Sequence, residues 1–220
     1  MKILAIDTAN YACSATVWRD GSALSNYSQY MIRGQSEALL PAIEFVMKQA
    51  VIRFNELDAI AVTTGPGSFT GVRVGLATAR AIGLANAIPT IGILSTQVIA
   101  TQIHNDTNSP IAVVLDARRM EIYIQLFSPG GEPIDQPHCV TPKAGVDMLN
   151  DGVWLVCGNA TELIKPHLNQ RQSIIYVENT DTAVLAELAT HAPKTNNTPS
   201  PVYVRPPDAK IPENEGRIRV

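Results

Sequence analysis

A glycine-rich turn between an apolar strand and an apolar helix is the part of this sequence best suited to do chemistry. It runs from Gly65 to Gly71 and reads Gly-Pro-Gly-Ser-Phe-Thr-Gly. Backbone amides and hydroxyls at a helix N-terminus attract anions, so the turn could hold a phosphate group. The same residues also fit a tight structural turn in which Ser68 caps the helix. The turn has neither a Walker lysine nor the third glycine of a dinucleotide fingerprint, so the structural interpretation is favoured while the other stays open.

Two aspartates follow apolar strands and are candidates for a metal-bound phosphate site. Asp7 ends the apolar run that begins at Ile3, and Asp116 ends the run that begins at Ile111. Such a carboxylate can help to hold a metal–phosphate group, or it can simply accept hydrogen bonds from turn amides. For Asp7 both interpretations stay open, whereas for Asp116 the structural one is favoured. The candidate phosphate or nucleotide site comprises Asp7, Thr8, Gly65, Gly67, Ser68 and Thr70.

Other reactive side chains are spread along the chain without a catalytic spacing. The histidines lie more than twenty residues apart, so no single helix carries two of them at metal-ligand spacing. No serine stands in a Gly-x-Ser-x-Gly elbow, and the three cysteines form no Cys-x-x-Cys pair. We therefore predict no metal site built from local histidines, no covalent catalysis and reduced structural thiols. These residues are His104, His138, His167, His191, Cys13, Cys139 and Cys157.

Composition and charge exclude several classes of protein. The chain has 220 residues, 45% of them hydrophobic, and a net charge of −3 at neutral pH. That charge and the scattered lysines and arginines argue against autonomous nucleic-acid binding. The N-terminus reaches Asp7 after only four apolar residues, too few for a signal peptide. The helix from Phe69 is interrupted by Arg73 and Arg80 and is no membrane span. We expect a cytoplasmic protein without membrane contact.

Periodicity predicts an α/β chain with an internal duplication. A strand that ends in aspartate, a short turn and a second strand occur near the N-terminus and again after residue 110. The two aspartates are 116 − 7 = 109 positions apart, close to half the chain. A segment near the C-terminus, Pro201 to Arg205, is an apolar island that could dock. The expected strands are 2–7, 13–18, 23–30, 57–64, 90–94, 111–116, 121–127 and 153–157, and the expected helices are 37–53, 69–87, 95–104, 162–168 and 181–191.

The first two helices are apolar on more than one side. A single face would satisfy a core, so the remaining apolar surface predicts a subunit interface. The second helix also contains Gly71 and Gly75, four residues apart on one face, and each interior glycine costs about 1 kcal/mol relative to alanine. We interpret that face as a contact surface for another backbone. The predicted interface consists of Leu39, Leu40, Ile43, Val46, Phe69, Val72, Gly75, Leu76 and Ala79.

These segments together resemble the TsaB family, formerly called YeaZ. The resemblance rests on the opening Ile3 to Ala9, on Leu39-Leu40-Pro41, on Thr64 to Gly75, on Leu115 to Arg118 and on Pro201 to Arg205, in that order. It implies two RNase H-like lobes of the actin, heat-shock ATPase and sugar-kinase (ASKHA) superfamily, with a shortened second lobe. The lobes are expected at 1–105 and 106–206, followed by a flexible tail at 207–220.

The resemblance also implies a function. Members of the family take part in forming N6-threonylcarbamoyladenosine next to the anticodon of tRNAs that read codons beginning with A. They act as a non-catalytic scaffold and activator of TsaD, together with the ATPase TsaE. The expected partners are TsaD in a heterodimer, TsaE, a second copy when the chain is alone, and tRNA only through the complex. No cofactor is expected on this chain alone, although ATP or ADP at the subunit junction is an open alternative.

The catalytic relative, TsaD, holds its metal through a histidine pair at i and i+4 near the first helix. The matching stretch here, 33–39, contains no histidine. The resemblance therefore implies that this chain carries no transfer site of its own, and a metallopeptidase activity is disfavoured for the same reason. The alternative from another class is a small nucleotide-binding hydrolase or kinase-like enzyme that uses Asp7 and the Gly65-to-Gly71 turn.

Overall fold

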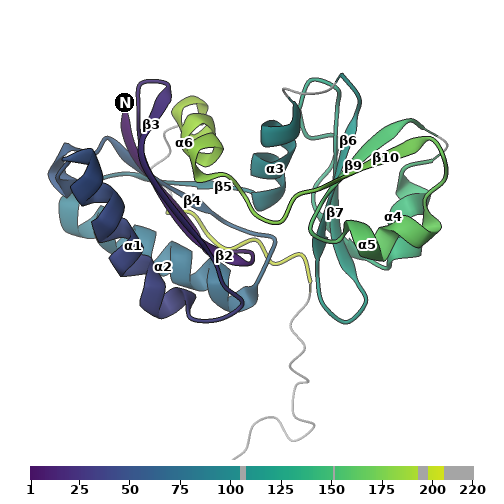
Figure 1. Ribbon diagram of the computed structural model, residues 1–220, viewed down its shortest axis with the longest axis horizontal. Helices are drawn as coiled ribbons and strands as arrows, with labels where there is room; N and C mark the ends of the chain where they lie inside the picture. Colours follow the sequence, from purple (N-terminus) through teal and green to yellow (C-terminus); the bar gives the residue numbers. More distant parts are fainter. Residues whose placement is uncertain (105–107, 151, 193–197, 206–220) are drawn as a thin grey trace, which may run out of the picture.

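The computed structural model describes residues 1–104, 108–150, 152–192 and 198–205. Two five-stranded sheets form the centres of two lobes, so the protein is α/β, as predicted. Figure 1 shows the order across the molecule: α1 and α2, the first sheet, α6 and α3 between the sheets, the second sheet, and then α4 and α5.

The first sheet has the order β3-β2-β1-β4-β5. Its first three strands form the predicted antiparallel meander, and β4 and β5 run parallel to β1. Along β1, alternate residues face opposite sides: Leu4 and Ile6 join one core cluster, and Ile3 and Ala5 join another. The central strand β1 is therefore buried on both faces, whereas the edge strand β3 is largely exposed. The strands are β1 Lys2–Asp7, β2 Ala12–Arg19, β3 Ser22–Tyr30, β4 Ala59–Thr63 and β5 Thr90–Ile93.

The second sheet repeats the first. Read in the same direction its order is β8-β7-β6-β9-β10, with β6, β7 and β8 antiparallel and β9 and β10 parallel to β6. Asp7 and Asp116 end the equivalent strands β1 and β6, so the predicted duplication is confirmed. The strands are β6 Ile111–Asp116, β7 Ile122–Phe127, β8 His138–Val140, β9 Trp154–Gly158 and β10 Gln172–Tyr176.

The helices differ strongly in length between the lobes. The first lobe carries α1 Gln35–Ala50 and α2 Phe69–Asn86 on one face of its sheet. The second lobe carries only the short helices α4 Pro142–Met148 and α5 Thr161–Ile164 in the corresponding place. The remaining elements are α3 Ser95–His104, α6 Thr182–His191 and the 3-10 turns η1 Phe54–Glu56 and η2 Lys165–His167.

Two helices exchange lobes. From α6, Leu185 and Ala186 pack on Ile3 of the first sheet, although α6 follows the second sheet in sequence. From α3, Ile99 packs on Ile111 of the second sheet, although α3 precedes that sheet. The expected boundary between residues 105 and 106 therefore separates the two sheets but not the helices that cover them.

Helix ends depart from the prediction in two places. The helix expected at 37–53 is α1, which begins earlier and ends earlier, at Gln35 and Ala50; the residue before it is Gly34, which supplies no side-chain cap, and Pro41 lies within the helix. The helix predicted at 162–168 ends at Ile164 and continues as the 3-10 turn η2, which contains Pro166. Ser68, in contrast, is the residue before α2, and its hydroxyl accepts a hydrogen bond from the Gly71 amide at 3.3 Å, as predicted.

Residues 198–205, here called the C-terminal strap, cross from one lobe to the other. The Val202 amide donates to the Thr64 carbonyl at 2.9 Å, and Arg80 of α2 donates to the Pro199 carbonyl at 3.2 Å. At the far end Arg205 donates to the Ala117 carbonyl at 3.1 Å in the second lobe. The predicted docking of this apolar island is confirmed, whereas the tail predicted at 207–220 lies outside the described residues.

The glycines of α2 contact the chain's own first lobe. A Cβ on Gly71 would lie 1.9 Å from the Thr8 carbonyl oxygen, and a Cβ on Gly75 would lie 2.9 Å from the Thr8 hydroxyl. The Thr8 hydroxyl in turn donates to the Gly71 carbonyl at 2.7 Å. The glycine face is a contact surface, as predicted, but the backbone that it meets is intramolecular. It is therefore not part of a subunit interface.

We expect Gly71→Ala to destabilise the first lobe by about 3 kcal/mol, because the added methyl group must push α2 away from the Thr8 backbone. Chemical denaturation of the purified protein measures this loss. Gly130→Ala is the matched control: its Cβ would meet only the Ser128 hydroxyl at 3.6 Å. It should change stability by no more than about 0.5 kcal/mol. Equal stability of the two variants would contradict the close contact.

Candidate functional site

Asp7 is completely buried and its carboxylate is enclosed by hydrogen-bond donors. The Thr180 hydroxyl donates to it at 2.6 Å, the Ala9 amide donates at 3.0 Å, and the Thr63 hydroxyl also donates. Burial raises the pKa of Asp7, and the hydrogen bonds from Thr180, Thr63 and the turn amides only partly oppose that shift. A carboxylate held in this way organises its turn and does not face a cavity.

The glycine-rich turn uses several of its polar groups internally. The Ser68 amide donates to the Ala9 carbonyl at 2.7 Å, and the Val72 amide donates to the Ser68 carbonyl at 2.9 Å. A Cβ on Gly67 would lie 2.4 Å from the same Ala9 oxygen. These contacts make the turn a brace between α2 and β1, which agrees with the structural interpretation of its sequence.

A cavity of about 730 Å³ lies between the lobes, here called the interlobe cavity. Of the predicted phosphate-site residues, Gly67, Ser68 and Thr70 line it, whereas Asp7, Thr8 and Gly65 do not. The predicted set is thus divided between a buried brace and an open cavity. Further lining residues are Tyr11, Gln35, Phe69, Arg73, Asp116, Arg118, Arg119, Asn159, Tyr203 and Arg205.

The first-lobe wall of the cavity carries an arginine stacked on aromatic rings. The Arg73 guanidinium lies 3.6 Å from the centre of the Phe69 ring, and its Nε donates to the Tyr203 hydroxyl at 2.7 Å. The rings of Phe69 and Tyr203 are themselves 5.6 Å apart. Because Phe69 begins α2 and Tyr203 belongs to the C-terminal strap, this stack joins the two elements.

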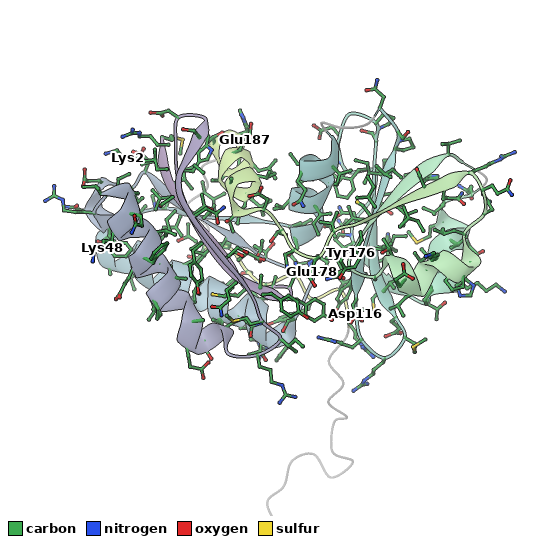
Figure 2. The ribbon with its side chains drawn as sticks, in the orientation of Figure 1. Lys2, Lys48, Asp116, Tyr176, Glu178 and Glu187 are labelled. Carbon is green, nitrogen blue, oxygen red and sulfur yellow. The ribbon has the colours of Figure 1, made fainter. Side chains whose placement is uncertain are left out.

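Asp116 organises the opposite wall, at the junction of the lobes in Figure 2. Its carboxylate accepts hydrogen bonds from the Arg118 amide at 2.7 Å and from the Tyr11 hydroxyl at 3.0 Å. It also pairs with the Arg118 guanidinium at 3.3 Å. Burial, and next the Asp116 carboxylate, raise the pKa of Tyr11, so this phenol stays protonated and keeps donating. The structural role favoured for Asp116 is confirmed by its bond to the turn amide.

The turn after Asp116 has an unusual backbone. Arg118, Arg119 and Met120 have φ angles of 65°, 53° and 63°, so three consecutive residues with side chains occupy the left-handed region. Each costs roughly 1–2 kcal/mol relative to a right-handed conformation. Backbone strain of this kind persists where the surrounding structure enforces it, often at binding sites. Here it places two arginines on the rim of the interlobe cavity.

Most of the predicted interface residues lie inside the first lobe and not on its surface. Seven of the nine are buried against the first sheet, which corrects their assignment as partner contacts. Their apolar periodicity is that of the lobe's own core. Leu40 and Phe69 are the two that are exposed, at 54% and 58%. The buried seven are Leu39, Ile43, Val46, Val72, Gly75, Leu76 and Ala79.

The outward sides of α1 and α2 are nevertheless apolar. Leu84 is 87% exposed and Phe45 is 47% exposed. Every exposed residue of α2 from position 74 onward is alanine or leucine, without a charge. On α1 the apolar residues alternate with charged ones such as Lys48, which Figure 2 shows on this side of the molecule. We call this surface the outer helical face; it comprises Leu40, Phe45, Ala77, Ala81, Leu84 and Ala85.

Within the described residues, neither the cysteines nor the possible metal-ligand side chains form a reactive centre. All three cysteines are free thiols, and burial raises the pKa of Cys157 to about 12 and that of Cys13 to about 11. Those two thiols therefore stay protonated and unreactive at neutral pH. In the described part of the chain, no three His, Cys, Asp or Glu side chains gather as metal ligands. None of the helices found there is long and apolar enough to cross a bilayer.

Comparison with known proteins identifies relatives of the chain. Residues 27–140 match the family model described as TsaD, tRNA N6-adenosine threonylcarbamoyltransferase. The tRNA threonylcarbamoyladenosine biosynthesis protein TsaB of Escherichia coli is 32% identical over 56% of this chain and 53% of its own length. The Bacillus subtilis protein of the same name is 31% identical over 70% of this chain and 65% of its own length. The chain thus aligns with about half to two thirds of these relatives.

A solved structure shares the fold along nearly the whole chain. The structure of YeaZ from Pseudomonas aeruginosa superposes with a TM-score of 0.80 at 23% identity, covering 92% of this chain and 99% of that one. The likeness extends over both lobes and therefore includes the strands β9 and β10 of the second sheet, which lie beyond the end of the family-model match at residue 140.

Replacing Asp7 tests its buried, structural role. We expect Asp7→Asn to be at least as stable as the unchanged protein at pH 7, and Asp7→Ala to lose about 1–3 kcal/mol through unsatisfied donors. The raised pKa of Asp7 means that the folded state keeps the proton to higher pH than the unfolded state does. The stabilisation that protonated Asp7 gives the folded state is therefore full below pH 3.8, the ordinary pKa of aspartate, and is lost as pH rises through the pKa of Asp7 in the folded protein.

The stability advantage of Asp7→Asn over the unchanged protein should accordingly grow between pH 4 and pH 7. Denaturant titrations at both pH values measure it, with Asp7→Ala as the variant that removes the acceptor altogether. If the stability difference between Asp7→Asn and the unchanged protein became smaller with rising pH, the proposed role of Asp7 would be wrong.

Proposed function

Because the chain belongs to the TsaB (YeaZ) family of tRNA threonylcarbamoyladenosine biosynthesis proteins, we propose that it acts in that pathway as a non-catalytic subunit. In this proposal it binds a TsaD-type partner and stabilises the partner's active conformation. The observation that carries the proposal is the outer helical face, because its α2 part is apolar and without charge, and such a surface is costly to leave in water.

The shape of this surface suits helix packing. On α2, Ala77, Ala81 and Leu84 recur at intervals of four and three residues, the spacing of a seam between packed helices. Small alanines let a partner helix approach closely, and Leu84 supplies a side chain that can insert between its neighbours. A partner that presents two helices of its own would complete a four-helix arrangement with α1 and α2. A second copy of this chain would meet the same requirement, and we expect weak self-association without the partner.

The scaffold role is supported by the absence of histidine from the stretch that corresponds to the metal ligands of the catalytic relative. The stretch 33–39 includes the first residues of α1, and the first of these, Gln35, lines the interlobe cavity. The stretch contains no imidazole, so it cannot supply the pair of histidine ligands that the catalytic relative uses. We propose that threonylcarbamoyl transfer occurs on the partner, and that any contact with TsaE or with ATP or ADP arises in the assembled complex.

A nucleotide-hydrolysing enzyme is the competing proposal, and the geometry gives it less support. Such a mechanism needs Asp7 to face an incoming metal–phosphate group, but its carboxylate is fully buried and accepts three hydrogen bonds from the protein. Calorimetry with ATP and magnesium separates the two proposals. Micromolar binding that is abolished by Asp7→Asn would favour the enzyme, and no heat would favour the scaffold.

We expect Leu84→Asp to weaken association with a TsaD partner by about 3 kcal/mol or more, because the interface would bury an unpaired carboxylate. The variant's own stability should fall by only about 1 kcal/mol, since the side chain is exposed and the cost is limited to helix propensity and the helix dipole. Analytical ultracentrifugation of the mixture measures association. Reconstituted tRNA modification, with and without this chain, measures the functional consequence.

Val153→Asp is the matched control, since Val153 is an exposed valine of the second lobe, 62% accessible, away from α1 and α2. It should bind the partner normally. If Leu84→Asp also binds normally and supports full tRNA modification, the outer helical face is not the partner surface and the proposal fails.

A further inference from the structure

Four arginines from three distant segments of the chain line the interlobe cavity. Arg73 comes from α2, Arg118 and Arg119 from the β6–β7 turn, and Arg205 from the C-terminal strap. The chain as a whole is acidic, so this cluster is a local departure from its overall charge. We propose that the interlobe cavity binds an unpaired segment of RNA, with arginines on its phosphates and aromatic rings against its bases.

The charges of the cavity favour an anion. Arg118 is paired with Asp116, and Arg205 lies 3.1 Å from Glu121. Arg73 is held by groups that carry no charge, the ring of Phe69 and the hydroxyl of Tyr203. Its positive charge is therefore not neutralised by these contacts. A guanidinium oriented by stacking keeps donors available for phosphate oxygens.

Aromatic rings stand beside the arginines on the first-lobe side. Tyr203 is 50% exposed and stacks near Phe69, with Arg73 over both rings. Tyr11 stacks on Tyr30 at 6.4 Å. The Arg118 guanidinium lies 5.2 Å from the Tyr11 ring. Arginines interleaved with exposed rings are typical of proteins that bind single-stranded nucleic acid, where bases stack and the backbone follows the positive charge.

The size of the cavity favours RNA that is not base-paired. Its volume, about 730 Å³, lies within the range of pockets for small molecules. It has room for a nucleotide splayed out of a loop but not for a helix of paired strands. The strained β6–β7 turn provides a rigid rim, because Asp116 fixes the backbone that carries Arg118. A preformed rim lowers the entropic cost of binding.

The choice of RNA over other planar anions rests on the proposed function, in which a tRNA is the substrate of the assembly. An acidic chain is expected to bind RNA weakly by itself. Its cavity would contribute most once the partner holds the tRNA nearby, because binding is then intramolecular. The cavity would in that case orient the unpaired loop of the tRNA.

Fluorescence anisotropy with a labelled ten-nucleotide single-stranded RNA tests the proposal on the full chain. A duplex of the same sequence is the comparison, because simple charge attraction predicts at least equal affinity for the more highly charged duplex. Stacking in the cavity predicts tighter binding of the single strand. We expect the single strand to bind at least about fivefold more tightly than the duplex at low salt.

Arg118→Ala should reduce the affinity for the single strand and lower the slope of log K against log salt by about 0.7, the value of one phosphate contact. Lys165→Ala removes the same charge from an exposed position outside the cavity and should leave binding unchanged. Tyr203→Leu should weaken binding about fivefold or more through lost stacking, whereas Tyr203→Phe, which keeps the ring, should largely restore it.

Equal binding of duplex and single strand, or equal effects of Arg118→Ala and Lys165→Ala, would overturn the proposal. Complete competition by ATP at equimolar concentration would also overturn it, since the cavity would then be a mononucleotide site. Its failure can be told apart from failure of the scaffold function, because Arg118→Ala leaves the outer helical face intact and should still bind the partner. Conversely, loss of the partner role would leave RNA binding by the isolated chain unaffected.

Discussion

The close contact between the glycine-rich turn and the β1–β2 turn determines much of the structure. Gly67 and Gly71 lie so near the Ala9 and Thr8 carbonyl oxygens that no other residue fits without displacing the backbone. This contact fixes the start of α2 on β1. It thereby directs Phe69 toward the interlobe cavity and the alanine-rich side of the same helix toward solvent. One packing constraint thus positions both surfaces to which we assign a function.

The two duplicated sheets are held together by helices and by the C-terminal strap, in addition to the chain segment that connects them. α3 and α6 each cover the sheet of the other half, and the C-terminal strap contacts both lobes. The cavity between the lobes is further spanned by the bond from the Tyr11 hydroxyl to the Asp116 carboxylate. Several independent contacts therefore set the separation of the two cavity walls. A site built from both walls can be preorganised in this way although its residues are distant in sequence.

The sequence was sufficient to predict most of the strands, the duplication and the cap at Ser68, because these depend on local periodicity and turn chemistry. It missed β10, an edge strand of largely exposed residues, and the short helix α4. It did not reveal which apolar side of α1 and α2 faces the sheet. Leu39, Ile43 and Val46 form the more regular apolar stripe, and this stripe packs in the core of its own lobe. The solvent side has the weaker pattern of alanines with Leu84. The arginine cluster gave no local signal either, because Arg73 and Arg205 meet Arg118 only after both sheets have formed.

The exchange of helices has a consequence for biosynthesis on the ribosome. The inner face of the first sheet, with Ile3, Ala5 and Ala61, is covered by α6, which begins at Thr182. At about 5–20 residues per second, some 90 residues must be translated after β5 before α6 emerges, an interval of roughly 5–20 seconds. During that time the nascent N-terminal half presents an uncovered apolar sheet. The order of the elements along the gene product therefore makes early chaperone contact advantageous.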